Sequence, residues 1–380
     1  MKNILKKIKP MRVLIYLALF AAVLFAVVVF VAFREEINSG TVERLRDFFR
    51  WGGDEEAYET FRFDPGRQNR YEVAGGRLVL LSPERFAFYD KTGYEKYSRS
   101  LAYKMPALCR AGDKVIAYDR MEPGCLVAGE RSVLLELPER VTAAAGNDRG
   151  QFILVTKEDN YRSAARLYDK KNKPAYVWRS SRYIMAAGLS PLGTRMAVAA
   201  VGQGGDLIGA RVTFLEVGRE EPLREIDLPD VLPLYIFYPD NSHVCIITES
   251  LVYFYTDKGD LLGEHGWDGE TLLRYASSTE ALFLQLGRYA DGQYSRLACL
   301  GYEGAVLDTM SFNEGLTDFS AAGKFISLLE PDGRITRYTI APDGLKQPLR
   351  AGGEGARGVL QQDKGSALIL FQDYAVWDMT

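Results

Sequence analysis

The sequence predicts an all-β protein built from eight similar four-stranded units, preceded by one transmembrane helix. Three observations predict this fold class. One strand pattern recurs eight times at intervals of 37 to 48 residues, no long helical pattern follows residue 57, and an uncharged run of 21 residues lies near the N-terminus. Units of four strands, repeated without intervening helices, are typical of a β-propeller.

The uncharged run, at 13–33, reads VLIYLALFAAVLFAVVVFVAF. At ~1.5 Å per residue it is long enough to cross the ~30 Å hydrocarbon core of a bilayer. The alternative is a cleaved signal peptide, whose apolar region typically has about 7–15 residues and ends in a small-x-small site. This run is longer and ends in Val-Phe-Val-Ala-Phe, so we expect an uncleaved anchor that binds the lipid bilayer through residues 13–33.

The charge pattern around this run predicts its orientation. Residues 1–33 hold five basic residues and no acidic one, whereas Arg34-Glu35-Glu36 follows the run. The positive-inside rule then makes 1–12 a cytoplasmic basic tail and places 34–380 outside the cell. We therefore expect a single-pass protein of the cell membrane with an extracytoplasmic C-terminal domain.

The charge of that domain argues against nucleic acid as a partner. The whole chain carries −3 and residues 1–33 carry +5, which leaves −8 on residues 34–380. Binding to nucleic acid needs a basic face that neutralises phosphates. A mildly acidic body therefore predicts no nucleic-acid partner.

Residues 34–56 are expected to form a juxtamembrane linker with one short helix, TVERLRDFFRW, at 41–51. Thr41 is a suitable cap, and the apolar residues that follow it recur at helical spacing. Two interpretations are open. The helix lies on the outer membrane surface with its aromatic side chains at headgroup level, or it packs its apolar stripe on the domain.

The repeated strand has eight copies, and each is followed by a third and usually a fourth strand. The copies are GRLVLLS (76–82), DKVIAYD (113–119), QFILVTK (151–157), TRMAVAA (194–200), SHVCIIT (242–248), EALFLQL (280–286), KFISLLE (324–330) and SALILFQ (366–372). Their spacing is close to the ~40–45 residues of a four-stranded propeller blade. We predict eight blades, or seven if the unit at 76–101 is irregular.

A second motif marks hairpin turns in three of the units. FAFYDKTG (86–93), ARLYDKKN (165–172) and VYFYTDKG (252–259) each run an alternating strand into Asp-Lys and a turn. Asp90, Asp169 and Asp257 align, at separations of 79 and 88 residues, which is twice the length of a blade. We interpret the motif as the turn between third and fourth strands, which Gly93 closes with a positive φ.

The propeller is expected to span 57–380 and to close on itself. The last unit, SALILFQDYAVWDMT, has its second and third strands but no fourth, whereas AYETFRFD (57–64) is a strand without a unit. We expect 57–64 to pair as the outer strand of the last blade. That pairing joins the two ends of the ring by main-chain hydrogen bonds and leaves no open interior edge.

These residues resemble known propellers. Tyr89-Asp90, Tyr168-Asp169 and Trp377-Asp378 stand where WD-repeat blades carry Trp-Asp, although the Gly-His dipeptide of those repeats is missing. YDKKNKPAYVW and TDKGDLLGEHGW look like segments of quinoprotein-like and outer-membrane-assembly propellers. The whole layout resembles a family of uncharacterised, membrane-anchored propeller proteins of clostridial bacteria. That family has no assigned activity, so the resemblance implies architecture and location only.

No pattern in the sequence identifies a catalytic, cofactor-binding or metal site, and we name no residues for one. His243 and His265 are the only histidines, and both are expected to be structural. A Gly-x-Ser-x-Gly elbow is missing, VGQGGDLIG (201–209) does not match a phosphate loop, and the Asp-x-Gly turns lack the ligand density of a calcium loop. The cysteines, which have no metal-site spacing and no adjacent pair, are expected to be small buried side chains: Cys109, Cys125, Cys245 and Cys299.

The function expected from these features is that of a binding or scaffold module at the cell envelope, with a protein partner there. A propeller is a rigid disc whose faces are made of loops, and loops on a rigid scaffold commonly bind partners. The alternative is a small-molecule-binding or enzymatic propeller that uses the central funnel. Carboxylates or arginines clustered at the inner ends of the strands would distinguish it.

Overall fold

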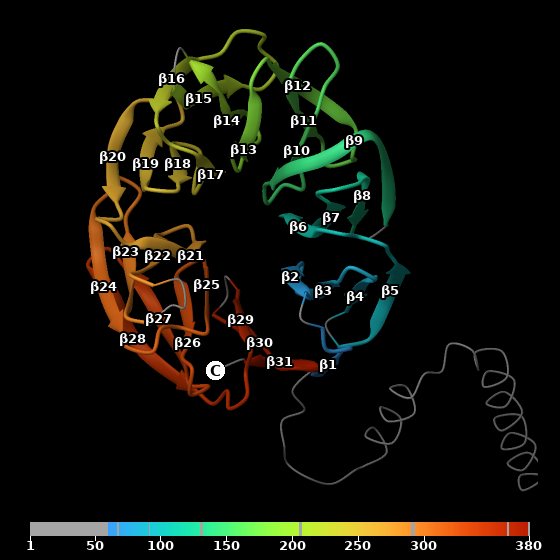
Figure 1. The fold of residues 1–380 in the computed structure, drawn as a ribbon. Coiled ribbons are helices and arrows are strands. Elements are labelled where there is room, and N and C mark those ends of the chain that lie inside the picture. The colour runs from blue at the N-terminus through green and yellow to red at the C-terminus, as the bar shows by residue number, and fades with distance from the viewer. Residues whose placement is uncertain are drawn as a thin grey trace, which may run out of the picture. The chain divides into compact units, whose positions relative to one another are not determined.

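The computed structural model describes residues 60–66, 68–90, 92–129, 132–204, 207–289, 293–362 and 365–378, which lie in a compact unit at Tyr58–Thr380. Strands and turns make up these residues, and the strands form antiparallel sheets arranged in a ring (Figure 1). The all-β prediction is confirmed. The predicted span at 13–33 and the linker at 34–56 lie outside the described residues. The described residues contain no helix that is long and apolar enough to cross a membrane.

The strands described form six sheets of four strands and one sheet of seven. From the innermost strand outward, the first sheet is β2 (Arg70–Ala74), β3 (Arg77–Leu81), β4 (Arg85–Tyr89) and β5 (Glu95–Ser100). The seven-stranded sheet is β6 (Pro106–Ala111), β7 (Lys114–Asp119), β8 (Pro123–Ala128), β9 (Val133–Gly146), β10 (Phe152–Thr156), β11 (Ser163–Tyr168) and β12 (Pro174–Ser180).

The other sheets continue around the ring. They are β13 (Tyr183–Leu189), β14 (Arg195–Gly204), β15 (Leu207–Glu216) and β16 (Arg224–Pro229); β17 (Pro233–Phe237), β18 (His243–Thr248), β19 (Leu251–Thr256) and β20 (Leu261–Gly266); β21 (Thr271–Ser277), β22 (Leu282–Gly287), β23 (Ser295–Leu300) and β24 (Val306–Phe312). The last two are β25 (Asp318–Ala322), β26 (Phe325–Leu329), β27 (Ile335–Ala341) and β28 (Gly344–Ala351); β29 (Gly358–Gln361), β30 (Ala367–Leu370), β31 (Tyr374–Asp378) and β1 (Thr60–Arg62).

The seven-stranded sheet is two four-stranded units that share one strand. The N-terminal half of β9 pairs with β8, for example Leu135 with Cys125, and the C-terminal half pairs with β10, for example Ala145 with Ile153. The inner strand of the second unit is therefore not separate from the outer strand of the first, because the chain runs on as one strand of 14 residues.

All eight copies of the repeated segment form the second strand of a unit: β3, β7, β10, β14, β18, β22, β26 and β30. They are predominantly apolar because each is covered on both faces by neighbouring sheets. In β10 every residue is buried. Ile153 and Val155 lie in the core shared with the sheet that follows, and Phe152 and Leu154 lie in the core shared with the preceding unit.

The first and last described strands, β1 and β31, pair in the last sheet. The strand expected at 57–64 is present at Thr60–Arg62, where it pairs antiparallel with β31, Phe61 opposite Ala375. The Phe61 side chain is fully buried and contacts both Tyr89 and Trp377 edge-on. The outer strand of the last sheet therefore comes from the N-terminal side of the ring.

The hairpin motif is a turn stabilised by one side-chain oxygen. Asp90 Oδ1 accepts hydrogen bonds from the backbone N–H groups two and four residues later, at 2.9 and 3.1 Å, and Asp169 Oδ1 does the same at 2.8 Å for both. Gly93 closes the first turn with φ +77°. These are hairpin turns, as the motif predicted.

The third copy of the motif was misaligned by one residue. The turn after β19 is closed by hydrogen bonds from Thr256 N–H to Asp260 O and from Gly259 N–H to Thr256 O, so Thr256 occupies the place of Asp90. Its hydroxyl accepts from the Asp260 N–H at 3.0 Å. Asp257 instead binds Arg195 of the preceding sheet at 3.0 Å.

Candidate functional site

The ring has two faces that differ in the connections they carry. One face carries the connections from first to second and from third to fourth strands, and β1 begins there: a Cβ atom built on Gly93 would lie 2.4 Å from the Thr60 carbonyl oxygen. We term it the proximal face. The distal face carries the connections from second to third strands and those between successive sheets.

Large apolar side chains are exposed on the distal face. Nine such residues, each 47% to 62% exposed, lie in its connections or at the start of inner strands: Met105, Met121, Tyr161, Tyr183, Met185, Leu232, Leu234, Tyr289 and Tyr294. On the proximal side, five of the exposed residues lie instead at the start of outer strands, on the rim: Val133, Leu134, Leu261, Leu262 and Val306. Exposed apolar side chains that gather on one face mark an interaction surface.

Buried or capping carboxylates fix these connections in place. Asp119, at the end of β7, is 1% exposed and accepts backbone N–H hydrogen bonds from Met105 and Met121, both at 2.9 Å. Glu249 accepts from the backbone N–H of Leu232 at 2.5 Å. The distal face is therefore rigid where its apolar side chains are displayed, which lowers the entropy lost on binding.

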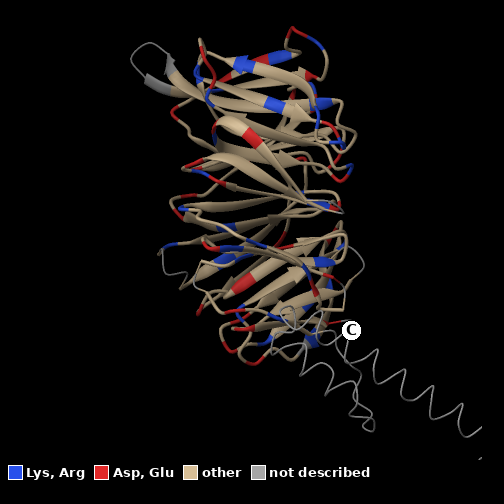
Figure 2. Ribbon diagram, turned by 90° about the vertical axis from the view of Figure 1, so that its right-hand side faces the viewer, with Lys and Arg blue, Asp and Glu red and all other residues tan. Residues whose placement is uncertain are grey.

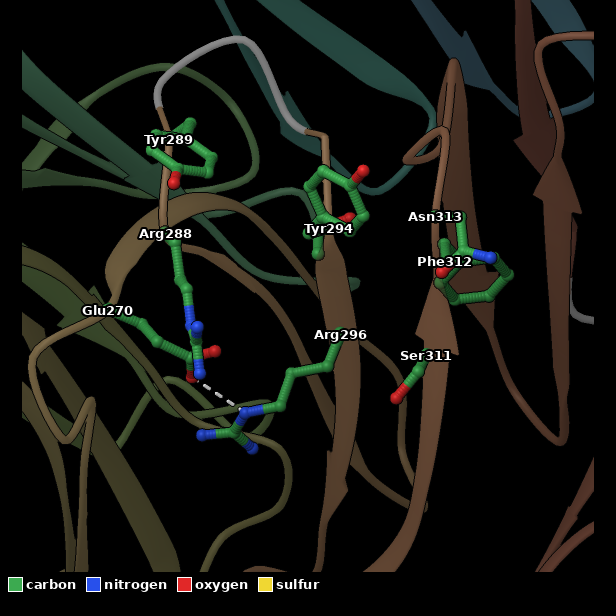
Figure 3. A pocket seen from close by; sticks show the side chains of 9 residues that line it. Glu270, Arg288, Tyr289, Tyr294, Arg296, Ser311, Phe312 and Asn313 are labelled. Carbon is green, nitrogen blue, oxygen red and sulfur yellow. Dashed lines mark hydrogen bonds and ion pairs between the residues drawn. The ribbon is translucent and has the colours of Figure 1, made fainter.

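A cavity of about 460 Å³ opens at the distal end of the sheet β21–β24 (Figure 3). Its lining residues come from the connection before β21, from the connection between β22 and β23, and from the ends of β23 and β24: Glu270, Arg288, Tyr289, Tyr294, Ser295, Arg296, Ser311, Phe312 and Asn313. Its polar groups lie on two sides of the exposed tyrosines.

The cavity carries more positive than negative charge. Arg296 Nε donates to Glu270 Oε2 at 2.7 Å, whereas Arg288 forms no ion pair with any residue that the structure describes. In Figure 3 both guanidinium groups extend toward Glu270. Burial lowers the pKa of the nearby His265, and the positive charge of Arg296 lowers it further. Lys, Arg, Asp and Glu are interspersed around the ring (Figure 2).

The backbone is strained at the edge of this cavity. Tyr294 has φ +51°, a left-handed conformation that bulky side chains rarely adopt. Its backbone N–H donates to the Asn313 carbonyl at 3.1 Å, which ties it to the end of β24, and its ring is 62% exposed. Such a conformation costs about 1–2 kcal/mol, and no burial of the ring offsets that cost.

The centre of the ring has buried polar groups without a catalytic arrangement. Burial raises the pKa of Glu72 on β2, while Arg110 acts in the opposite direction. Burial raises the pKa of the Cys109 thiol on β6 to about 12, with a contribution from Glu72. A thiol with that pKa is protonated near neutral pH and is a poor nucleophile. Among the described residues no three His, Cys, Asp or Glu side chains are placed to hold a metal ion.

The histidines, cysteines and glycines that the sequence analysis considered as site residues lie among other side chains or within strands. His243 Nδ1 lies 2.7 Å from Asp240 Oδ2, and the ring of His265 lies beside Trp267. The four cysteines are free, three of them buried and Cys109 half-buried. Gly202, in the VGQGGDLIG segment, lies within β14 opposite Gly209 of β15.

No motif in the sequence indicated the cavity at the distal end of β21–β24. Its charged members are far apart in the chain and form no motif: Glu270, Arg288 and Arg296. The available signal was the length of the connection between β22 and β23, which spans seven residues at 288–294 and carries two tyrosines. Long connections on a rigid scaffold are frequent binding elements.

Comparisons with known proteins identify the fold. A family model described as a family of unknown function, DUF5711, matches residues 55–339. A search of curated proteins gave no match. BamB from Moraxella catarrhalis is similar with a TM-score of 0.52 and 12% identity, over 84% of this chain and 96% of BamB.

Two structures of Sqt1 are also similar. Chaetomium thermophilum Sqt1, bound to the N-terminus of ribosomal protein L10, has a TM-score of 0.57 and 10% identity, over 84% of this chain and 99% of Sqt1. Saccharomyces cerevisiae Sqt1 has a TM-score of 0.56 and 6% identity, over 85% and 96% of the two chains. At such low identity the likeness shows the propeller fold alone.

Proposed function

Because the chain belongs to DUF5711, a family of unknown function, and its described residues fold as a β-propeller, we propose that it is a protein-binding module whose distal face receives the partner. The observation that carries this proposal is the set of nine exposed methionine, leucine and tyrosine side chains in the connections and inner strands of that face. Aromatic residues and methionine are enriched in protein interfaces. Sqt1, a propeller of similar fold, was solved with a ribosomal protein segment bound.

The proposal includes the blade count. Eight units, with β9 as the outer strand of one and the inner strand of the next, make an eight-bladed disc. A disc of this kind gives the distal face eight connections between second and third strands, from which an extended binding surface is built.

The proposal also includes an anchor at 13–33 and an extracytoplasmic location. Among the described residues β1 begins on the proximal side, because Thr60 lies beside the turn of Gly93. The nine exposed apolar side chains named above lie on the opposite, distal face, and we propose that this face receives the partner in the cell envelope.

The test is capture of a partner by the full-length chain, solubilised in detergent from cross-linked cells. Leu234→Asp places a charge on the distal face, and Leu261→Asp places the same charge on the proximal rim; the two side chains are 51% and 55% exposed. A partner should be captured by the wild type and by Leu261→Asp and lost with Leu234→Asp. Equal capture by both variants, or no reproducible capture by the wild type, contradicts the proposal.

A further inference from the structure

We propose that the cavity at the distal end of β21–β24 binds an acidic peptide segment of the partner, with one carboxylate side chain held by Arg288 and Arg296. This inference rests on the proposed function, because the cavity opens among the connections of the distal face. It adds the chemistry of the segment that is recognised.

The first argument is the supply of donors. Arg288 has no ion pair with a described residue, and Arg296 engages Glu270 only through Nε. No described residue therefore engages the terminal nitrogens of Arg296 or the guanidinium group of Arg288. A planar guanidinium group matches a carboxylate with two parallel hydrogen bonds, and such charge-assisted pairs are the stronger ones.

The second argument is the balance of charge. Two guanidinium groups and the Glu270 carboxylate line the cavity, so its described lining residues carry a net single positive charge. A carboxylate, with one negative charge, balances it, whereas a doubly charged phosphate would be repelled by Glu270. Residues 34–380 carry −8, so an anionic peptide is not attracted by the body as a whole and needs this local site.

The third argument is the pair of exposed tyrosines. Tyr289 and Tyr294 line the cavity on one side of the charged groups (Figure 3) and are 58% and 62% exposed. Tyrosine gives a large contact area for little conformational entropy, and aromatic rings beside a charged contact exclude water from it. The strained backbone of Tyr294 holds its ring in this exposed place, as strain does at ligand-binding positions.

The test uses full-length protein in detergent and isothermal titration calorimetry. The probe is hexaglutamate with an acetylated N-terminus and an amidated C-terminus, so that its only carboxylates are side chains. Hexaglutamine with the same ends is the uncharged comparison. We expect the wild type to bind hexaglutamate more weakly as salt rises and not to bind hexaglutamine. Loss of a charge-assisted hydrogen bond predicts at least about tenfold weaker binding for Arg288→Ala.

Arg149→Ala is the matched control. Arg149 is an exposed arginine in the connection between β9 and β10, on the proximal face, and its replacement removes the same charge. Its affinity for hexaglutamate should equal that of the wild type. Equal affinities of wild type and Arg288→Ala, or no binding of hexaglutamate by the wild type, overturn the inference.

Tyr294→Gly separates a binding role from a structural one. Glycine adopts φ +51° without strain, so the variant should keep or raise the melting temperature while its affinity for hexaglutamate falls several-fold. A lower melting temperature with unchanged affinity would make Tyr294 structural and remove the third argument. Displacement of hexaglutamate by inorganic phosphate at equal concentration would show a general anion site and overturn the assignment to an acidic peptide.

The two proposals fail in different ways. If partner capture depends on Leu234 but the wild type does not bind hexaglutamate, this inference is wrong and the proposed function stands. If hexaglutamate binds through Arg288 but capture is insensitive to Leu234→Asp, the cavity binds acidic segments and the distal face is not the docking surface.

Discussion

The buried carboxylate of Asp119 accepts a hydrogen bond from the backbone N–H of Met105 at 2.9 Å, although 14 residues separate them. It also accepts from the N–H groups of Lys104 and Met121, at 2.7 and 2.9 Å. One side chain thus fixes two connections of the distal face, from which both methionines project. In the sequence Asp119 is the last residue of the repeated strand DKVIAYD.

We predict that Asp119→Ala destabilises the propeller by about 2–4 kcal/mol, because it leaves three backbone donors without their acceptor. Asp119→Asn should cost less, since its amide oxygen replaces one of the two accepting oxygens. Urea unfolding of the two variants measures both values. A loss below about 0.5 kcal/mol for Asp119→Ala would show that water replaces the carboxylate and that the connections are not held by it.

Gly93 gives a second prediction, for the closure of the ring. A Cβ atom there would lie 2.4 Å from the Thr60 carbonyl oxygen, and φ is +77°. Gly93→Ala should therefore cost the left-handed conformation, about 1–2 kcal/mol, plus the displacement of β1. The melting temperature should fall, and residues near Thr60 should become more accessible to protease.

Gly218→Ala is the comparison that isolates the contact. Gly218 has φ +92°, but a Cβ atom there would have no neighbour within 4 Å. Gly218→Ala should lose only the stability that the left-handed conformation costs an alanine. If the two alanine variants lose equal stability, Thr60 moves aside at no cost and the packing of β1 against this turn does not contribute to closure.

The repeated strands were predictable because burial on both faces leaves a continuous apolar run that needs no alignment to recognise. The course of β9 was not predictable, because the boundaries of strands were inferred from residues that favour turns. No Gly, Asn or Asp interrupts 133–145, so the chain has no site to reverse and runs on into the next unit. Thr256 was missed for a related reason: a hydroxyl fills the same place as a carboxylate, and the letters Asp-Lys-Gly misled the alignment by one residue.

The buried ion pair between Arg337 and Asp378 gives a third prediction. Arg337 Nη2 lies 2.7 Å from Asp378 Oδ2, the side chains are 4% and 10% exposed, and the pair joins β27 to β31 of the next sheet. Asp378 was noted in the sequence only for its resemblance to the Trp-Asp of WD repeats, and it ends β31 inside the core. Asp378→Ala should cost about 3–5 kcal/mol, because it leaves a guanidinium charge buried without this partner.

A double-mutant cycle tests the pair itself. Arg337→Met combined with Asp378→Leu removes both charges and fills part of the space, so its loss should be well below the sum of the single losses. The free energy of unfolding in urea gives each corner of the cycle. Additive losses would mean that the two side chains stabilise the sheets independently.

The candidate site was less predictable than the fold. Glu270, Arg288 and Arg296 come from three segments, and only the pairing of β22 with β23 and of β23 with β24 brings their ends to one place. Nothing in the local sequence distinguishes Arg288 from an arginine on any solvated turn. Arg288 is a candidate binding residue because it forms no ion pair with a described residue, which can be seen only in the structure.

The last prediction is a pH dependence from His265. Burial lowers its pKa below the ordinary 6.5, and the charge of Arg296 lowers it further. As pH falls, the unfolded chain therefore takes up the proton before the folded chain does. The stability that the neutral ring contributes is complete above about pH 6.5 and is lost as pH falls through the lower folded pKa. The free energy of unfolding of the wild type should decrease from about pH 7.5 to pH 5, where histidine side chains titrate.

His265→Leu should reduce that decrease, and His243→Gln, which changes the only other histidine, should leave most of it. An identical pH profile for His265→Leu and the wild type would show that the ring takes up its proton in the fold as readily as in the unfolded chain.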